Sequence, residues 1–282
     1  MRKAKALSPD MLRELYFVRG LSHRAIAREV GLSEPTVRAR FHEYGFIPRK
    51  RGSWMVKYPK LPFDGSNEEK AYMMGFRVGD MHVYRPSSGA DIIVARTNST
   101  QEEQFLVVRS LFAKYGGVIE SGKGKAKNIN CYLDESFSFL LIKKPYRIES
   151  WISRSRVNSL AFMAGYIDAE GNFIISQGRA RFKLDAYDHE ILRWMHEELA
   201  ALGVISRLRL LANKGEISYN NTYKWKGDLW RLNVNEANSL LVFCRAILPH
   251  LRHRKRIADV QMCINNILER RKNGTIRPVA YP

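Results

Sequence analysis

Two carboxylates end two similar apolar stretches of the chain. The first stretch runs Tyr72-Met-Met-Gly-Phe-Arg-Val-Gly-Asp80, and the second runs Phe162-Met-Ala-Gly-Tyr-Ile-Asp-Ala-Glu170. Each has small residues four positions apart, which share one face of a helix. Glycine inside a helix costs roughly 1 kcal/mol relative to alanine, and close packing of the two helices is the gain that would offset it. Packed side by side, the helices bring Asp80 and Glu170 together, where two carboxylates repel unless a cation or a shared proton lies between them. The spacing therefore predicts a metal site built on a repeat.

The two stretches resemble the paired motifs of the LAGLIDADG homing endonucleases. The second, from Met163 to Gly171, fits the nine-residue signature at nearly every position. The first keeps the glycine at the third position and the acid at the eighth. It departs from the family at Arg77, where an apolar residue is usual, at Val78, where the family has its first acid, and at Met81, which replaces the final glycine.

The resemblance implies a metal site with Mg²⁺ or Mn²⁺ as the cofactor. Asp80 and Glu170 match the eighth-position acids, which bind metal in the family, and the residues after them, Met81 and Gly171, are assigned to the same site. The sixth-position acid is largely structural in the family. We therefore expect the departures in the first stretch to affect how that half is built more than its metal ligand.

From residue 65 the chain repeats an order of helices and strands. We expect helices at 65–80, 102–115, 136–142, 162–170, 189–202, 237–248 and 252–271, and strands at 82–84, 92–97, 118–121, 129–133, 173–176, 181–186, 205–211 and 228–233. Two αββαββα units result, the first over 65–150 and the second over 151–282. The resemblance implies an α+β pseudo-dimer with saddle-shaped antiparallel sheets and the motif helices as its central seam.

The first 46 residues predict a small all-α domain. Serine caps precede helices at Pro9, at His23 and at Glu34, and Gly31-Leu32-Ser33 makes the turn between the last two. The pattern resembles a helix-turn-helix DNA-binding domain, whose last helix enters the major groove and would present Arg38. A helical packing module is the alternative. Residues 47–64 predict a basic, proline-punctuated linker that follows a DNA groove or serves as a solvated tether.

The composition of the chain points to a polyanionic partner. The 282 residues carry a formal charge of +19, and the first 60 hold 14 Lys or Arg against 5 Asp or Glu. No apolar stretch approaches the roughly 20 residues that span a bilayer, and no P-loop or His-Glu-x-x-His motif occurs. Three widely separated cysteines favour a reducing, intracellular compartment, either the cytoplasm or nucleoid of a prokaryote or an organelle.

Basic and amide side chains on the strands and hairpins are the candidates for DNA contact. Alternation along the strands places groups of them on one face, where arginine is the usual reader of guanine. The DNA-binding candidates are Arg38, Arg49, Lys50, Arg51, Arg85, Arg96, Asn98, Lys123, Lys125, Arg179, Arg181, Lys183, Arg207, Arg209 and Lys224. The resemblance places a basic residue near the scissile phosphate, for which Arg254 or Lys255 is the candidate in the second half and Lys143 or Lys144 in the first.

The prediction from the whole sequence is a monomeric, metal-dependent endonuclease that cleaves double-stranded DNA at a long, nearly asymmetric site. Two rivals share the scaffold. One is a non-cleaving DNA-binding regulator, which the helix-turn-helix pattern favours. The other is a maturase that binds intron RNA. Retention of both Asp80 and Glu170 argues against the regulator, since it has no need of paired buried carboxylates.

Overall fold

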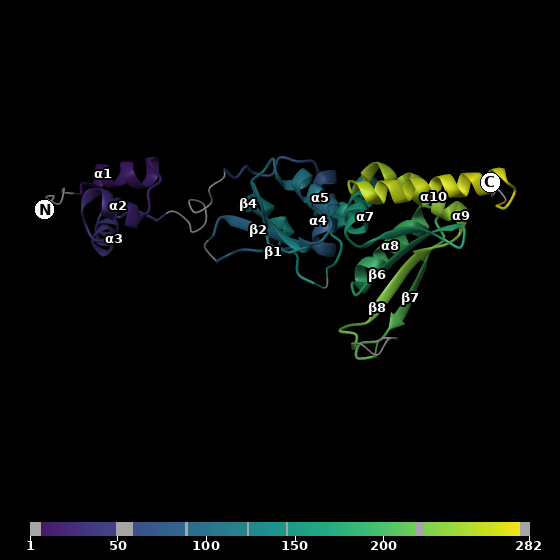
Figure 1. The fold of residues 1–282 in the computed structure, drawn as a ribbon. Coiled ribbons are helices and arrows are strands. Elements are labelled where there is room, and N and C mark those ends of the chain that lie inside the picture. The colour runs from purple at the N-terminus through teal and green to yellow at the C-terminus, as the bar shows by residue number, and fades with distance from the viewer. Residues whose placement is uncertain are drawn as a thin grey trace. The chain divides into compact units, whose positions relative to one another are not determined.

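The computed structural model describes residues 7–48, 59–87, 90–122, 124–144, 146–217 and 223–276. The chain divides into two compact units, residues 1–57 with 87–91 and residues 58–86 with 92–282 (Figure 1). This division falls inside the expected linker. Among the described residues, no helix is long and apolar enough to cross a membrane.

The N-terminal unit is helical. It consists of α1 (Pro9–Arg13), the π-helical turn η1 (Glu14–Val18), α2 (His23–Val30) and α3 (Glu34–Glu43). The side chains of Ser8, Ser22 and Ser33 accept hydrogen bonds from the first turns of α1, α2 and α3, as the capping pattern predicts. Gly31 ends α2 in the left-handed conformation, with φ of 75°, so that α3 can pack back on α2 through Val37 and Phe41.

The larger unit contains the repeat. Its first half is α4 (Asn67–Asp80), β1 (His82–Tyr84), β2 (Ile92–Ser99), α5 (Glu102–Phe112), β3 (Gly117–Ser121), β4 (Lys127–Asp134) and η2 (Glu135–Leu140). Its second half is α6 (Ser150–Ser153), α7 (Arg156–Glu170), β5 (Asn172–Ser176), β6 (Arg179–Ala186), α8 (His189–Ala201), β7 (Arg207–Ala212), β8 (Leu229–Val234), α9 (Ala237–Ile247), η3 (Leu248–His250) and α10 (Arg254–Lys272). Two four-stranded antiparallel sheets form, ordered β1-β2-β4-β3 and β5-β6-β8-β7. The α+β pseudo-dimer expected from the sequence is confirmed.

Helices α4 and α7 form the seam between the two halves. A Cβ atom built on Gly75 would lie 2.0 Å from the carbonyl oxygen of Phe162, and one on Gly165 would lie 2.1 Å from that of Tyr72. Further along, a Cβ on Gly79 would meet the Cβ of Ala169 at 2.4 Å. The backbones therefore approach as closely as the spacing of the small residues predicts, and Asp80 and Glu170, the last residues of the two helices, line the same cavity.

Each sheet packs one face against a common hydrophobic core. Side chains such as Ile93, Ala95, Phe182 and Leu184 join a single hydrophobic core that also holds the two seam helices. The alternate residues of β6 are more exposed, as period-two patterning requires. On β2 only the later alternates, Arg96 and Asn98, are exposed, whereas Ile92 and Val94 are buried as well.

Two elements differ from the expectation. The helix expected over 136–142 is the shorter 3₁₀ helix η2, and the short helix α6 was not expected. Asp134 caps η2 by accepting a hydrogen bond from the backbone of Ser136, so η2 begins directly after β4. The buried side chain of Arg77 binds the carbonyl of Leu140, where η2 ends.

Candidate functional site

Asp80 ends α4 in a polar environment of its own half. One of its carboxylate oxygens accepts hydrogen bonds from Gln104 Nε2 at 2.6 Å and from Thr97 Oγ1 at 3.1 Å. Burial raises the pKa of Asp80, and these two hydrogen bonds oppose that shift. Thr97 comes from β2 and Gln104 from α5, so two neighbouring elements fix the direction of this carboxylate.

Glu170 ends α7 beside Asp80 and is less well satisfied. Burial, and next the negative charge of Asp80, raise the pKa of Glu170 to about 7. The charges of Lys144 and Arg256 oppose this shift, whereas that of Asp188 adds to it. Part of the Glu170 surface is exposed, so this carboxylate lies at the rim of the site rather than in its interior.

A cavity of ≈ 350 Å³ opens at the two acids. Its lining is almost entirely polar and draws on both halves of the larger unit, with Asp80, Asn98, Ser99, Thr100, Gln101 and Gln104 from the first and Asp168, Ala169, Glu170, His253 and Arg256 from the second. The seam thus brings together residues from four separate parts of the sequence.

Asp168 holds the start of α10. Its Oδ2 accepts hydrogen bonds from Tyr72 Oη at 2.5 Å and from the backbone nitrogens of Arg252 at 2.7 Å and His253 at 3.1 Å. The Arg252 guanidinium lies over the Tyr72 ring, 4.6 Å from its centroid. Only 1% of the Asp168 surface is exposed, and its Oδ2 is committed to these structural contacts, whereas its buried Oδ1 has no hydrogen-bond partner among the described residues.

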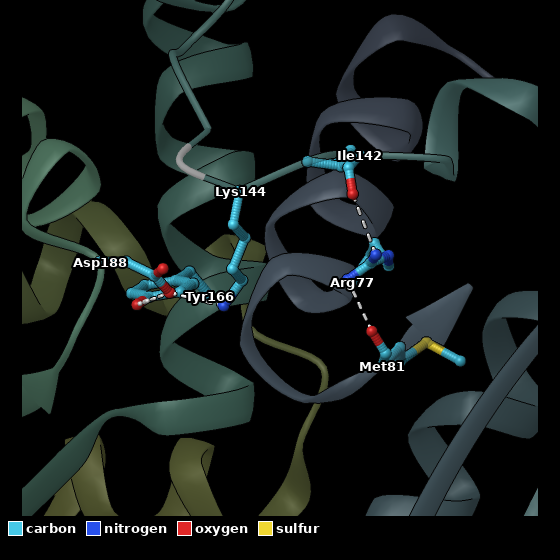
Figure 2. Close-up of polar contacts among 6 residues, drawn as sticks. All are labelled: Arg77, Met81, Ile142, Lys144, Tyr166 and Asp188. Carbon is cyan, nitrogen blue, oxygen red and sulfur yellow. Dashed lines mark hydrogen bonds and ion pairs between the residues drawn. The ribbon is translucent and has the colours of Figure 1, made fainter. Parts of the chain in front are cut away.

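Arg77 is a buried guanidinium that binds main-chain carbonyls. It donates from Nε to Leu140 at 3.0 Å, from Nη1 to Met81 at 2.6 Å and from Nη2 to Ile142 at 3.2 Å, the last two drawn in Figure 2. Burial lowers the pKa of Arg77. No carboxylate among the described residues pairs with it, so its charge is stabilised by peptide dipoles alone.

Met81 and Gly171 follow the two acids, as the sequence implied, but they differ in their surroundings. The Met81 carbonyl already accepts the hydrogen bond from Arg77. A Cβ on Gly171 would lie 2.7 Å from the side chain and 2.9 Å from the carbonyl oxygen of Ile167, so only glycine fits there. Their assignment to the metal site stays a prediction.

Lys144 lies on the segment that joins the two halves and pairs with Asp188. Its Nζ lies 2.8 Å from Asp188 Oδ2, and Tyr166 Oη donates to the same oxygen at 3.2 Å (Figure 2). Tyr166 is fully buried on α7, so Asp188 is held by a hydrogen bond from the seam helix and by an ion pair with Lys144.

The structure does not bring the other basic candidates to the acids. Arg254, Lys255 and Lys143 are exposed and none lines the cavity, and Lys255 pairs with Asp259 at 2.7 Å. Arg256 lines the cavity instead, because Asp168 fixes where α10 begins. His253 is also at the cavity, and burial lowers the pKa of its imidazole, so it is neutral at pH 7.

Sequence reasoning did not single out Arg256, His253, Thr97 or Gln104. Arg256 and His253 belong to the basic run 250–256, but the run alone does not show which side chains face the acids. Thr97 and Gln104 carry no motif, and only the packing of β2 and α5 against α4 places them at Asp80.

The exposed sheet faces carry the expected basic and amide groups. On β6 and β7 these are Arg179, Arg181, Lys183, Arg207 and Arg209, while on β2 Arg96 and Asn98 both donate to Asn128 Oδ1. Arg85 pairs with Glu135, and Arg38 on α3 pairs with Glu34. Lys125 and Lys224 are exposed in the hairpins. The candidates Arg49, Lys50, Arg51 and Lys123 lie outside the described residues.

The second half of the larger unit matches a known family. Residues 158–247, from α7 to α9, match the model of the LAGLIDADG-like domain. The chain therefore contains a LAGLIDADG-like domain, and its first half repeats the same sheet topology. Among curated proteins, no relative matches the chain.

Several solved structures are similar to this chain. The homing endonuclease I-DmoI in complex with DNA and Ca is 13% identical, covers 70% of this chain and 98% of its own, and has a TM-score of 0.49. I-DmoI with DNA and Mn is 13% identical and covers 64% of this chain and 96% of its own, with a TM-score of 0.45. Full-length DUF199/WhiA from Thermatoga maritima is 16% identical and covers 78% of this chain and 65% of its own, with a TM-score of 0.44.

Proposed function

We propose that this protein is a site-specific endonuclease that hydrolyses double-stranded DNA with divalent cations. The observation that carries the proposal is the convergence of Asp80 and Glu170 at one polar cavity, each delivered by a glycine-packed helix. A protein that only binds DNA gains nothing from placing two repelling carboxylates there. The match of residues 158–247 to the LAGLIDADG-like domain supports the proposal.

The residues at the cavity fit a hard divalent cation. Burial, and next the negative charge of Asp80, raise the pKa of Glu170, and a cation between the two carboxylates would relieve their repulsion. Among the described residues, no cluster of three or more His, Cys, Asp or Glu side chains could enclose a metal. That suits Mg²⁺ or Mn²⁺, because Mg²⁺ keeps several waters and is held by one or two carboxylates plus substrate phosphates. Asp80 and Glu170 would hold the cation, which supplies Lewis-acid activation of water and stabilises the leaving oxygen.

The chain's own side chains prepare the site for a phosphodiester. Thr97 and Gln104 keep Asp80 ionised and oriented by hydrogen bonding to one of its oxygens. Arg256 and Lys144 approach Glu170 from α10 and from the joining segment, and their charges oppose the negative charge that develops on a phosphate during hydrolysis. Gln101 lines the cavity near Asp80 and offers an amide that can orient water.

Binding would use the exposed faces of both sheets. Arg179, Arg181 and Lys183 on β6 and Arg207 and Arg209 on β7 make the second sheet strongly basic. The face of the first sheet carries Arg96 with the amides Asn98 and Asn128. Because the two faces differ in chemistry, we propose a long, asymmetric target bound by a monomer. The N-terminal unit would add contacts through α3 in a major groove.

Cleavage of duplex DNA tests the proposal. A target is first selected from a randomised duplex library by binding to the protein in Ca²⁺, and it is then incubated with the protein and Mg²⁺. Cutting of both strands supports the proposal. Tight binding without cutting supports a DNA-binding regulator, and preferential binding of intron RNA over this duplex supports a maturase.

A further inference from the structure

The two motifs of this chain anchor the segments next to them in opposite ways. In the second motif, Asp168 accepts hydrogen bonds from the backbone nitrogens of Arg252 and His253. The corresponding residue of the first motif is Val78, which is buried and offers no polar group. The first motif has instead the buried Arg77, directly before Val78, with 9% of its surface exposed.

Arg77 anchors the segment that follows the first half. Its guanidinium donates to the carbonyls of Leu140 and Ile142 as well as to that of Met81 (Figure 2). A carboxylate accepts hydrogen bonds from backbone N–H groups, whereas a guanidinium donates hydrogen bonds to backbone carbonyls. Asp168 and Arg77 therefore anchor their neighbouring segments through side chains of opposite charge. The planar, forked guanidinium can reach three acceptors at once, which a lysine ammonium on a single stem does less well.

Each anchored segment leads to a cation, one at the cavity and the other in an ion pair with Asp188. In the second half, the segment held by Asp168 begins α10 and places Arg256 at the cavity. In the first half, Lys144 follows Ile142 by two residues, and its ammonium lies 2.8 Å from Asp188. The charges of Lys144 and Arg256 both oppose the raised pKa of Glu170, Arg256 from the lining of the cavity and Lys144 from its ion pair with Asp188.

We propose that Arg77 is a positioning residue that takes the place of the acid missing from the first motif and holds Lys144 in its ion pair with Asp188. The inference rests on the proposed nuclease function for the role of Lys144, but not for the anchoring itself. It accounts for two departures of the first motif, Arg77 and Val78, with one arrangement.

The first arm of the test measures anchoring without any cleavage. Arg77→Met keeps the length and apolar stem of the side chain but cannot bind the carbonyls of Leu140, Met81 and Ile142. Backbone amide hydrogen exchange at Leu140 and Leu141, in and directly after the last turn of η2, should then speed up by roughly tenfold. Leu111→Ala in the buried part of α5 is the control for general destabilisation, and it should leave that segment's exchange relative to the rest of the larger unit unchanged. Equal exchange in Arg77→Met and wild type would overturn the inference even if the protein cuts DNA.

The second arm follows the two DNA strands separately under single-turnover conditions. Because Lys144 and Arg256 come from different halves, Arg77→Met and Lys144→Met should slow the same strand by at least roughly tenfold more than the other and let nicked duplex accumulate. Arg77→Lys should recover part of this rate, and adding Arg77→Met to Lys144→Met should change little, since the two act through one group. We expect Leu111→Ala to slow both strands equally. If Arg77→Met does the same, Arg77 only stabilises the fold and does not position Lys144. If wild type leaves DNA uncut, the proposed function fails and the exchange arm alone decides the anchoring.

Discussion

The hydroxyl of Tyr72 on α4 donates a 2.5 Å hydrogen bond to Asp168 on α7, across the seam between the two halves. The same carboxylate oxygen holds the start of α10, and Arg252 of that segment lies over the Tyr72 ring. The seam therefore does more than bring two acids together. It also sets where α10 begins, and so it determines that Arg256 rather than Arg254 or Lys255 lines the cavity.

Close packing of the seam predicts a large penalty for any side chain at its glycines. Gly75→Ala would place a methyl group 2.0 Å from a backbone carbonyl oxygen on α7, which cannot move aside without separating the helices. We expect a loss of roughly 3 kcal/mol or more in the free energy of unfolding by denaturant titration, and a similar loss for Gly165→Ala. Gly124→Ala is the control, because a Cβ there meets nothing within 4 Å. If Gly75→Ala and the control Gly124→Ala lower the free energy of unfolding equally, the two helices do not approach closely at Gly75.

The raised pKa of Glu170 predicts that stability falls as the pH rises. An acid whose pKa is higher in the folded protein favours folding while it is protonated. Its contribution is complete below the ordinary value of 4.5 and is lost as the pH passes about 7. In EDTA at pH 8, the free energy of unfolding of Glu170→Gln should exceed that of wild type, because glutamine does not ionise. The difference should be only roughly 1 kcal/mol, since solvent screens the partly exposed side chain. At pH 4.5 the two proteins should unfold at the same denaturant concentration. A constant difference across this range would mean that neither burial nor the charge of Asp80 raises the pKa of Glu170.

Basic groups on the second sheet should govern DNA affinity. Arg181→Ala on β6 should weaken DNA binding by roughly 1–3 kcal/mol if the side chain reads a base. If the side chain contacts a phosphate, the slope of log affinity against log salt concentration should become smaller by about one. Arg193→Ala on α8 is a matched control, since this exposed arginine pairs with Glu190 and Glu197 on its own helix. The affinities are measured by fluorescence anisotropy at several salt concentrations. If the two variants bind DNA equally tightly, DNA does not bind at Arg181 on β6.

The N-terminal unit should contribute phosphate contacts of its own. Deletion of residues 1–46 removes a separate helical core, so the larger unit should keep its thermal stability. Binding of the selected duplex should weaken, and the plot of log affinity against log salt should become less steep because fewer counterions are released. A truncated protein with unchanged affinity would make this unit a packing module.

The fold was largely predictable from the sequence because its signals are local and periodic. Small residues four apart predict the seam, and alternation along 179–186 predicts which face of β6 is exposed. The strands lie within two residues of their expected limits. Helix 136–142 was the exception, because its end is set by Arg77 binding the carbonyl of Leu140, a contact between residues 63 positions apart.

The site was predictable only where a motif marks it. Asp80 and Glu170 end the repeated stretches, so their positions follow from the pattern. The choice among Arg254, Lys255 and Arg256 depends on the rotation of α10, which Asp168 fixes from 84 residues away. Gln104 and Thr97 reach Asp80 through tertiary packing, and nothing in their local sequence marks them.

Cleavage by Asp80→Asn tests directly whether Asp80 holds the catalytic cation. Asparagine keeps the size of the side chain and an oxygen that can accept from Gln104 and Thr97, but it removes the charge that would hold a cation. With Mg²⁺ and the selected duplex, we predict that wild type cuts both strands, while Asp80→Asn loses at least roughly a hundredfold in single-turnover rate and still binds the DNA. If Asp80→Asn cuts the duplex at the wild-type rate, Asp80 does not hold the catalytic cation.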